Sequence, residues 1–132
     1  MAAAAVDIVS EVCRRFTQDE QPFDLLSEDI LWEVPMFDHD EAFHGHRGVA
    51  EFFRRWLGTW EGYEFELDEL HPCTDGRVVT LFTERGRGRG SGVPVEIHPL
   101  GVWTISGEKV VAYRGYMDRD EGLRDADVCL GA

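Results

Sequence analysis

The sequence GRVVTLFTERGRGRGSGVPVEIHPLGVWTISGEKVVAYRGYMD, residues 76–118, decides the fold. It contains three runs rich in β-branched and aromatic residues, separated by the turn signals Gly90-Ser91-Gly92 and Ser106-Gly107-Glu108-Lys109. Such runs, joined by short glycine-containing turns, are typical of antiparallel strands. The stretch therefore predicts three consecutive strands, over Val78–Phe82, Val93–Ile105 and Val110–Tyr116.

The residues before this stretch predict helices that cover one face of the sheet. Apolar side chains recur at helical spacing over residues 4–18 and over Gly48–Leu57, and Pro22 marks the start of a short helix between them. The chain is therefore expected to be α+β, with three helices in its N-terminal half. Further elements are expected as follows: strands at Ile30–Val34 and Tyr63–Asp68, a polar loop over residues 36–47, and a terminal helix at Arg119–Ala126.

Length and charge restrict the classes of partner. The 132 residues are expected to form a single domain, 1–132, and the formal net charge of −13 disfavours binding to nucleic acid or to an anionic membrane. No apolar stretch is long enough to span a membrane, and no basic residue precedes the short apolar run at the N-terminus, so no signal peptide is expected. Cys13, Cys73 and Cys129 lie far apart, which predicts reduced thiols and a cytoplasmic location.

A two-residue loop at Gly107-Glu108 sets the pairing of the last two strands. In that register Gly101 lies opposite Arg114, and the side chains of Arg114, Tyr116 and Asp118 share a face with Gly101 and Trp103. This face changes from apolar to polar toward Asp118, as small-molecule pockets commonly do. The other pairs expected are Ile105 with Val110, Trp103 with Ala112, Pro99 with Tyr116 and Ile97 with Asp118.

The strand that begins at Val78 has two alternative orientations. A two-residue loop at Ser91-Gly92 places Phe82 and Glu84 on the same face as Gly101 and directs Arg85 outward. A bulge or one extra loop residue exchanges the two faces. Glu84 is therefore a candidate site residue, with Arg85 as its alternative.

Several strings resemble the SnoaL-like branch of the ketosteroid-isomerase superfamily, which is similar in fold to nuclear transport factor two. They are LWEVP (31–35), FHGHRGVAEFF (43–53), GRGRGSGVPVE (86–96), GVWTI (101–105) and the segment from Val110-Val111 to Tyr116-Met117-Asp118. The resemblance implies a cystatin-like conical half-barrel, in which a curved, mainly antiparallel sheet wraps three N-terminal helices and leaves one deep apolar pocket. It also implies a homodimer formed through the outer sheet face, where Tyr113, His98 and Val102 are expected.

The resemblance points to Asp118 as the first catalytic candidate. In polyketide-cyclase relatives an acid at the end of the last strand shuttles protons, and Asp118 occupies the matching place. Desolvation raises the pKa of a carboxyl at the mouth of an apolar pocket and makes it a usable base or acid. Tyr116 and Arg114 are candidates to stabilise an oxyanion, and Glu84 is a fourth candidate. In the alternative, Asp118 caps the terminal helix and forms a structural ion pair with Arg114.

The walls of the expected pocket are mostly apolar, and His46 is expected to close over its mouth. The predicted ligand-binding residues are Phe16, Trp32, Val34, His46, Phe53, Trp56, Phe82, Gly101 and Trp103. The acids and histidines near Asp38 and His44 are expected to form a polar loop, so no metal and no cofactor is predicted. The polar groups of ketosteroid isomerases fall here at Val34, Gly101 and Val12, which disfavours steroid isomerisation.

Two functions are compatible with these features. The first is a cofactor-independent proton-transfer enzyme of the isomerase, cyclase or hydrolase type, acting on a hydrophobic, carbonyl-bearing small molecule. The second is a non-catalytic module that binds a ligand or dimerises. The second predicts a pocket that is closed or has no ionisable group at its base, and an Asp118 side chain that points to solvent or caps the helix.

Overall fold

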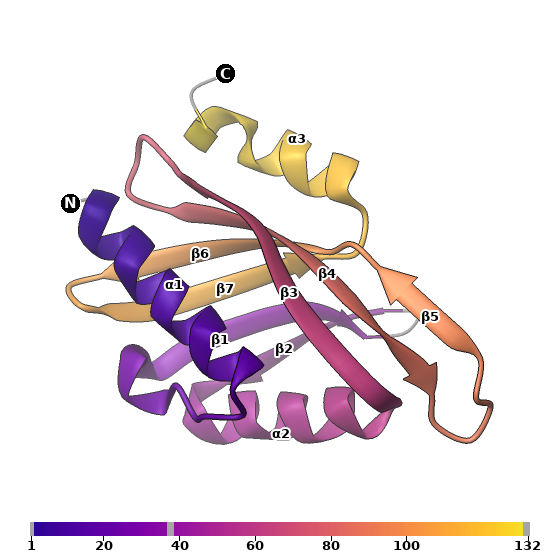
Figure 1. Cartoon of the computed structure of the whole chain (residues 1–132). Coiled ribbons are helices and arrows are strands. Elements are labelled where there is room, and N and C mark those ends of the chain that lie inside the picture. The colour runs from indigo at the N-terminus through magenta and orange to yellow at the C-terminus, as the bar shows by residue number, and fades with distance from the viewer. Residues whose placement is uncertain (1, 37–38, 131–132) are drawn as a thin grey trace.

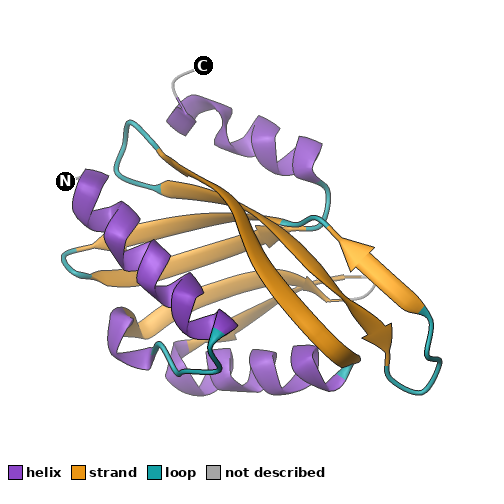
Figure 2. Cartoon of the chain, in the orientation of Figure 1, coloured by secondary structure: helices purple, strands orange, loops and turns teal. Residues whose placement is uncertain are grey.

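The computed structural model describes residues 2–36 and 39–130, and its helices lie on both faces of one curved sheet (Figures 1 and 2). Helices α1 and α2 lie on the inner face, and α3 lies on the outer face beside β6 and β7. The elements are α1 (Ala2–Thr17), η1 (Phe23–Leu25), β1 (Leu26–Met36), β2 (His39–His44), α2 (Gly45–Gly58), β3 (Trp60–Pro72), β4 (Val78–Gly88), β5 (Pro94–Ile97), β6 (Leu100–Ser106), β7 (Lys109–Tyr116) and α3 (Arg119–Leu130).

The expected α+β class is confirmed, with differences in the elements. The strand order is β2-β1-β7-β6-β4-β3, with β5 paired to β4. All pairs are antiparallel except β1 with β7. The second of the three predicted N-terminal helices is the short 3-10 helix η1. The strand predicted over Val93–Ile105 is two strands, because His98 and Pro99 interrupt it.

Part of the loop expected over residues 36–47 is the edge strand β2; Phe37 and Asp38 lie outside the described residues. Its backbone pairs with the free edge of β1, from Leu31↔His44 to Met36↔His39. These ladder hydrogen bonds do not depend on apolar side chains, so a polar edge strand has a weak sequence signal. Phe43 is its buried anchor, and Glu41 forms an ion pair with Arg55 of α2.

The core lies between the helices and the inner sheet face. Helix α1 contributes Val9, Val12 and Cys13, all fully or almost fully buried, as its helical spacing predicted. Trp32 and Trp103 project from the sheet to meet them. Burial of this much apolar surface is the main force that holds the two layers together.

The two faces of β4 are as predicted. Val78 pairs with Trp103 and Thr80 with Gly101, so Thr80, Phe82 and Glu84 belong to the inner face. Arg85 points outward, where it contacts Glu66 and Glu96. Both orientations were open from the sequence, and the structure has Glu84 inside.

The predicted register of β6 and β7 is wrong beyond its first pair. Ile105 lies opposite Val110 as expected, but Val111 is an extra residue, so Trp103 lies opposite Tyr113. Because side chains alternate between faces, a one-residue shift exchanges them. Arg114 therefore lies outward, opposite Val102, and Tyr113 lies inward.

This shift changes the face proposed for dimerisation. Tyr113 packs in the inner core, and Val102 is buried in an outer cluster with Leu100 and Tyr116, against which Gly122 of α3 packs. Of the three side chains expected on the outer surface, His98 is exposed there. Homodimerisation through the rest of this face stays a prediction.

Reduced thiols and the absence of a membrane span were also predicted from the sequence. Cys13 is free and buried, whereas Cys73 is in a disulfide, so the expectation of reduced thiols is wrong for Cys73. The side chain of Cys129 lies outside the described residues. Within the described part of the chain, no helix is both long and apolar enough to cross a membrane.

Candidate functional site

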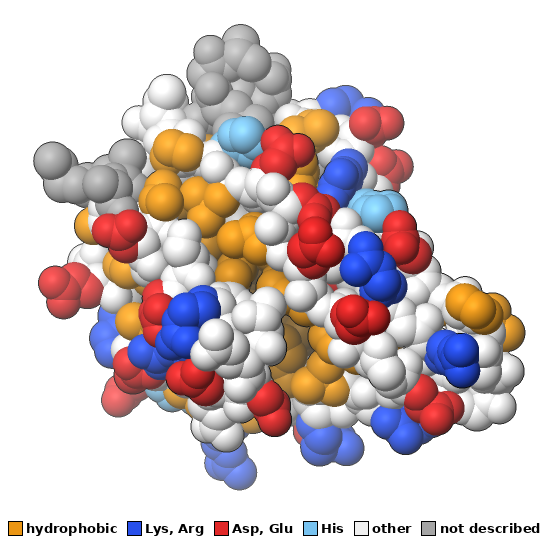
Figure 3. All heavy atoms as spheres, in the orientation of Figure 1, with side chains coloured by type: hydrophobic (Ala, Val, Ile, Leu, Met, Phe, Trp, Pro, Cys, Tyr) orange, Lys and Arg blue, Asp and Glu red, His pale blue; other side chains and the backbone are white. Residues whose placement is uncertain are grey.

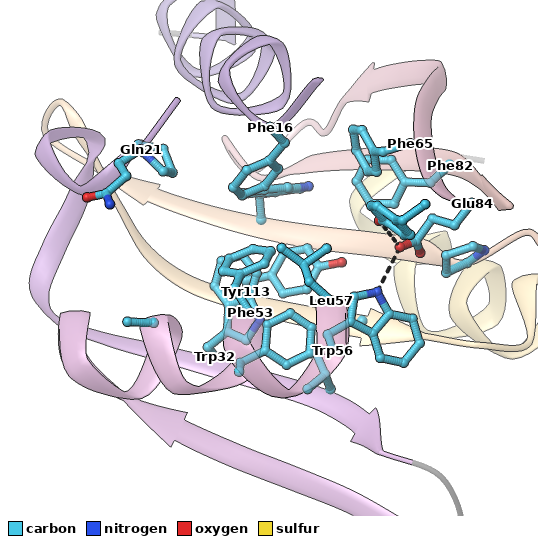
Figure 4. Close-up of a pocket in the computed structure, with 18 of the residues that line it drawn as sticks. Phe16, Gln21, Trp32, Phe53, Trp56, Leu57, Phe65, Phe82, Glu84 and Tyr113 are labelled. Atoms are coloured by element: carbon cyan, nitrogen blue, oxygen red, sulfur yellow. Dashed lines mark hydrogen bonds between the residues drawn. The ribbon is translucent and has the colours of Figure 1, made fainter. Parts of the chain in front are cut away.

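A cavity of about 460 Å³ opens between the inner sheet face and the helices α1 and α2. Figure 3 shows hydrophobic side chains in a hollow along the line between α1 and β3, and Figure 4 shows the cavity's side chains. Aromatic side chains from both layers make most of its wall. They are Phe16, Phe23, Trp32, Phe52, Phe53, Trp56, Tyr63, Phe65, Phe82, Trp103 and Tyr113.

Glu84 is the buried carboxyl of this cavity, with 8% of its surface exposed. It lies on the inner face of β4, and its Oε1 accepts a hydrogen bond from Trp56 Nε1 at 3.0 Å. The same oxygen accepts a short hydrogen bond from the hydroxyl of Tyr63 on β3 (Figure 4). Within the described part of the chain, Oε2 accepts no hydrogen bond and is not fully buried.

The surroundings of Glu84 favour its protonated form. Burial raises the pKa of Glu84, and the hydrogen bonds from Tyr63 and Trp56 oppose this shift by stabilising the carboxylate. Burial likewise raises the pKa of Tyr63 well above its ordinary value, and the adjacent Glu84 charge adds to the shift. Tyr63 therefore stays a hydrogen-bond donor across the pH range in which Glu84 titrates.

A second phenol side chain, that of Tyr113, packs against the backbone of Gly101 and Gly115. A Cβ atom on Gly101 would lie 2.6 Å from Tyr113 Cε1 and 2.9 Å from its hydroxyl, and one on Gly115 would lie 3.3 Å from that hydroxyl. Gly101 and Gly115 are directly opposite each other on β6 and β7. Together they leave the space that the Tyr113 ring fills, beside the indole of Trp32 at 4.2 Å between ring centroids.

Most of the predicted ligand-binding residues line the cavity. These are Phe16, Trp32, Val34, Phe53, Trp56, Phe82 and Trp103. Gly101 instead lies beneath Tyr113. His46 is not part of the wall: its Nε2 lies 2.8 Å from the carbonyl oxygen of Leu26, and its ring packs on Phe23. This contact joins the start of α2 to β1, so the prediction that His46 closes the mouth is wrong.

The structure does not bring Asp118, Arg114 and Glu84 together. Asp118 Oδ1 accepts hydrogen bonds from the amides of Asp120 at 2.9 Å and Glu121 at 3.3 Å, which is the helix-capping alternative. Arg114 forms an ion pair with Glu33 on the outer side of the sheet, with 3.4 Å between Nη1 and Oε2. Neither residue lines the cavity, because the extra Val111 turned this part of β7 over.

Tyr116 is the third residue of that predicted set. It lines the cavity at the end of β7, its ring lies 5.2 Å from the Arg114 guanidinium carbon, and it packs on Gly122 of α3. Glu84, the fourth candidate, is the one whose predicted inward face is confirmed.

Tyr63 and Tyr113 were not predicted from the sequence as site residues. Tyr63 belongs to an alternating strand in which Tyr63, Phe65 and Leu67 share a face, so its pattern indicates only a part of the sheet. That alternation, placed opposite the inner residues of β4, is the signal that finds it. The wrong register places Tyr113 outward, and nothing in its local sequence marks the extra Val111.

The polar groups of the cavity suit proton transfer better than metal binding. Among the described side chains, no three histidine, cysteine or acidic groups come together to hold a metal ion. The wall instead offers one buried carboxyl, two indole or phenol donors fixed on it, and a large apolar surface. A carboxyl held in this way can exchange a proton with a bound molecule.

The chain is similar to several solved structures over almost its whole length. An NTF2-like protein of unknown function from Burkholderia pseudomallei K96243 is 21% identical, with 98% of each chain covered and a TM-score of 0.76. A proposed SnoaL-like polyketide cyclase from Jannaschia sp. CCS1 is 14% identical, with 99% of this chain and 94% of that one covered and a TM-score of 0.75. TerC, co-crystallised with polyporic acid, is 15% identical, with 98% and 99% covered and a TM-score of 0.75.

At these identities the likeness establishes the fold and not the activity. No functionally curated protein matches the sequence. A sequence profile described as the SnoaL-like domain matches residues 19–113. This range spans most of the chain and includes α2, the strands β1 to β6 and the buried Glu84. The chain therefore belongs to the SnoaL-like domain family.

Proposed function

We propose that this protein is a cofactor-independent proton-transfer enzyme of the isomerase, cyclase or hydrolase type. Its substrate is a hydrophobic, carbonyl-bearing small molecule held in the aromatic cavity, and Glu84 is the group that exchanges the proton. The observation that carries the proposal is the arrangement of Glu84, whose Oε1 is fixed by Trp56 and Tyr63 while Oε2 is left for the cavity.

The two oxygens of Glu84 have different roles in this proposal. Because Oε1 already accepts two hydrogen bonds, a proton taken up by Glu84 resides on Oε2, the oxygen that a ligand can reach. The ionised form removes a proton from a carbon next to a carbonyl, and the protonated form returns it to another atom of the same molecule. Burial raises the pKa of Glu84, which moves the exchange between its two forms toward higher pH.

The aromatic wall supports this chemistry by excluding water. Removal of a proton from carbon creates an enolate, and fixed donors stabilise such a charge strongly where water is absent. Tyr113 is the phenol that we assign to this stabilisation, because its ring is buried on the cavity side of β7. Burial holds the pKa of Tyr113 far above neutral, so the hydroxyl keeps its proton and can donate it in a hydrogen bond.

A nitrobenzisoxazole tests the role of Glu84 without knowledge of the natural substrate. Removal of one carbon-bound proton from this flat ring breaks its N–O bond and gives a coloured cyanophenolate. We expect the protein to accelerate this ring opening, and Glu84→Gln to lower the rate by about 100-fold or more, the usual contribution of a positioned base. A rate no higher than that of free acetate, or an unchanged rate in Glu84→Gln, would contradict the proposal.

Two further variants sharpen this test. Tyr63→Phe removes a hydrogen bond that lowers the pKa of Glu84, so the midpoint of the pH–rate profile should move to higher pH. Asp118→Asn is the matched control, because asparagine retains the cap on α3. If the aromatic compound binds but no variant changes its slow spontaneous opening, the chain is the non-catalytic ligand-binding module instead.

A further inference from the structure

The acidic groups of the cavity wall can carry only negative charge, Glu84 when it is ionised. They are Glu84 and, on the turn between α1 and η1, Asp19 and Glu20. No arginine, lysine or histidine lines the cavity in the part of the chain that the structure describes. Glu20 is paired with Arg14 (Nη1 to Oε2, 3.3 Å), whose side chain does not line the cavity, and the chain as a whole has a net charge of −13.

These acids lie toward opposite ends of the cavity. In Figure 4, Glu84 is at one end of the row of aromatic side chains and Gln21, which follows Glu20, is at the other. The turn is fixed by backbone hydrogen bonds, in which the amide of Asp19 donates to Phe16 and the amide of Glu20 donates to Arg15. A molecule that fills the cavity therefore lies between protein carboxyl groups, with Glu84 near one of its ends and the acids of the turn near the other.

We infer that the cavity selects aromatic ring compounds without a negative charge and rejects their carboxylates. The inference rests on the proposed function, because it concerns the ligand of the same site. A ligand carboxylate would lose its water among aromatic side chains, gain no cation, and meet Glu84. An uncharged carbonyl or amide of the same shape gives up far less hydration and uses either protonation state of Glu84.

The test compares a naphthalenecarboxamide with the corresponding naphthalenecarboxylate, which differ in charge but hardly in shape. Isothermal titration calorimetry at neutral pH should give an affinity at least about tenfold higher for the amide, since an unpaired charge in an apolar site is costly. Glu84→Gln should raise the affinity for the carboxylate and leave that for the amide nearly unchanged. Equal affinities, tighter binding of the carboxylate, or binding of neither compound would overturn the inference.

Charge reversal at the turn gives an independent test. The double variant Asp19→Lys/Glu20→Lys should bind the carboxylate several-fold more tightly than the natural chain does, with little change for the amide. Glu28→Lys/Glu108→Lys is the matched control, because it changes the net charge equally at exposed positions outside the cavity wall. Equal gains in the two double variants would show that only the overall charge matters, which contradicts selection by the cavity.

The outcomes separate this inference from the proposed function. If ring opening of the nitrobenzisoxazole requires Glu84 but the carboxylate binds as well as the amide, selection by charge fails and proton transfer stands. If the amide is preferred but ring opening does not depend on Glu84, proton transfer fails and selection by charge stands.

Discussion

At the scale of single residues, Glu84 combines features that oppose stability and favour chemistry. It is buried, it faces an apolar cavity, and the partners of its carboxyl are two neutral donors, Trp56 and Tyr63, with no cation. Two neutral hydrogen bonds compensate only in part for the loss of hydration of a carboxylate. The pKa of Glu84 is raised because the loss of hydration outweighs these two hydrogen bonds.

Because the buried carboxylate of Glu84 is incompletely compensated, we expect Glu84→Gln to stabilise the fold at alkaline pH. The folded state holds a proton on Glu84 above the ordinary carboxyl pKa of 4.5, whereas the unfolded state releases it. Stability therefore falls as pH rises from about 4.5 through the raised pKa of the folded state. Glutamine retains an acceptor for Trp56 and Tyr63 but has no charge, so at about pH 8 the free energy of unfolding should be higher for Glu84→Gln than for the natural chain.

Urea unfolding of both proteins at about pH 8 and about pH 4 measures this difference, which should disappear at the acidic value. Glu108→Gln, at an exposed turn position, is the control and should change nothing. A Glu84→Gln protein less stable than the natural chain at alkaline pH would show that the carboxylate stabilises the fold. A variant that gains stability and loses turnover would have the behaviour of an active-site acid.

At the scale of elements, the paired glycines of β6 and β7 position Tyr113 against Trp32. Gly101→Ala would bring a methyl group within 2.6 Å of the Tyr113 ring, which is confined by Trp32 and Trp103. We expect a loss of about 1–3 kcal/mol in the free energy of unfolding, as for other overpacked cores.

The control for this substitution is Gly58→Ala. A Cβ atom at Gly58 has no neighbour within 4 Å, and Gly58 is the last residue of α2. The substitution Gly58→Ala should therefore leave the free energy of unfolding unchanged or raise it slightly. Thermal unfolding compares the two variants, and near-ultraviolet circular dichroism reports the environment of the aromatic rings. If both variants unfold like the natural chain, Tyr113 is not confined by Gly101.

Elements that follow a strict alternation could be predicted from the sequence, and those that depart from it could not. The inward position of Glu84 follows from the alternation Thr80, Phe82, Glu84 along β4, in which Thr80 pairs with Gly101 of β6 and Glu84 pairs with Ile97 of β5. The outward position of Arg114 depends on the single extra residue Val111. A bulge costs little energy and has no fixed sequence signal, so a register counted from the turn fails beyond it.

The remaining differences have similar causes. Strand β2 forms because β1 has a free edge, which is a property of the assembled sheet and not of residues 39–44. Asp118 has the sequence context of a helix cap as well as of a strand-end acid, and local hydrogen bonding to the amides of Asp120 and Glu121 decides between them. The resemblance identified the family correctly. It predicted Asp118 as the residue that transfers the proton, whereas the carboxyl that lies in the cavity wall on the sheet is that of Glu84.

At the scale of the whole molecule, the sheet separates two environments. Its inner face and the helices α1 and α2 enclose the cavity, whereas α3 packs on the outer face against Leu100 and Tyr116 (Figure 1). A ligand in the cavity joins the two inner layers without contact to most of α3. Its stabilising effect should therefore be distributed unequally over the molecule.

Hydrogen exchange can measure this distribution with the naphthalenecarboxamide as the ligand. At a hundredfold excess over its dissociation constant the compound should stabilise the fold by about 2.7 kcal/mol. Amides that exchange through local opening should be protected in the turn Gln18–Phe23 and at the end of α2, because Phe23, Trp56 and Leu57 line the cavity. The amides of α3 that exchange locally should not change, since α3 lies on the other face of the sheet. Equal protection of α3 and the turn, or protection of α3 alone, would place the ligand outside this cavity.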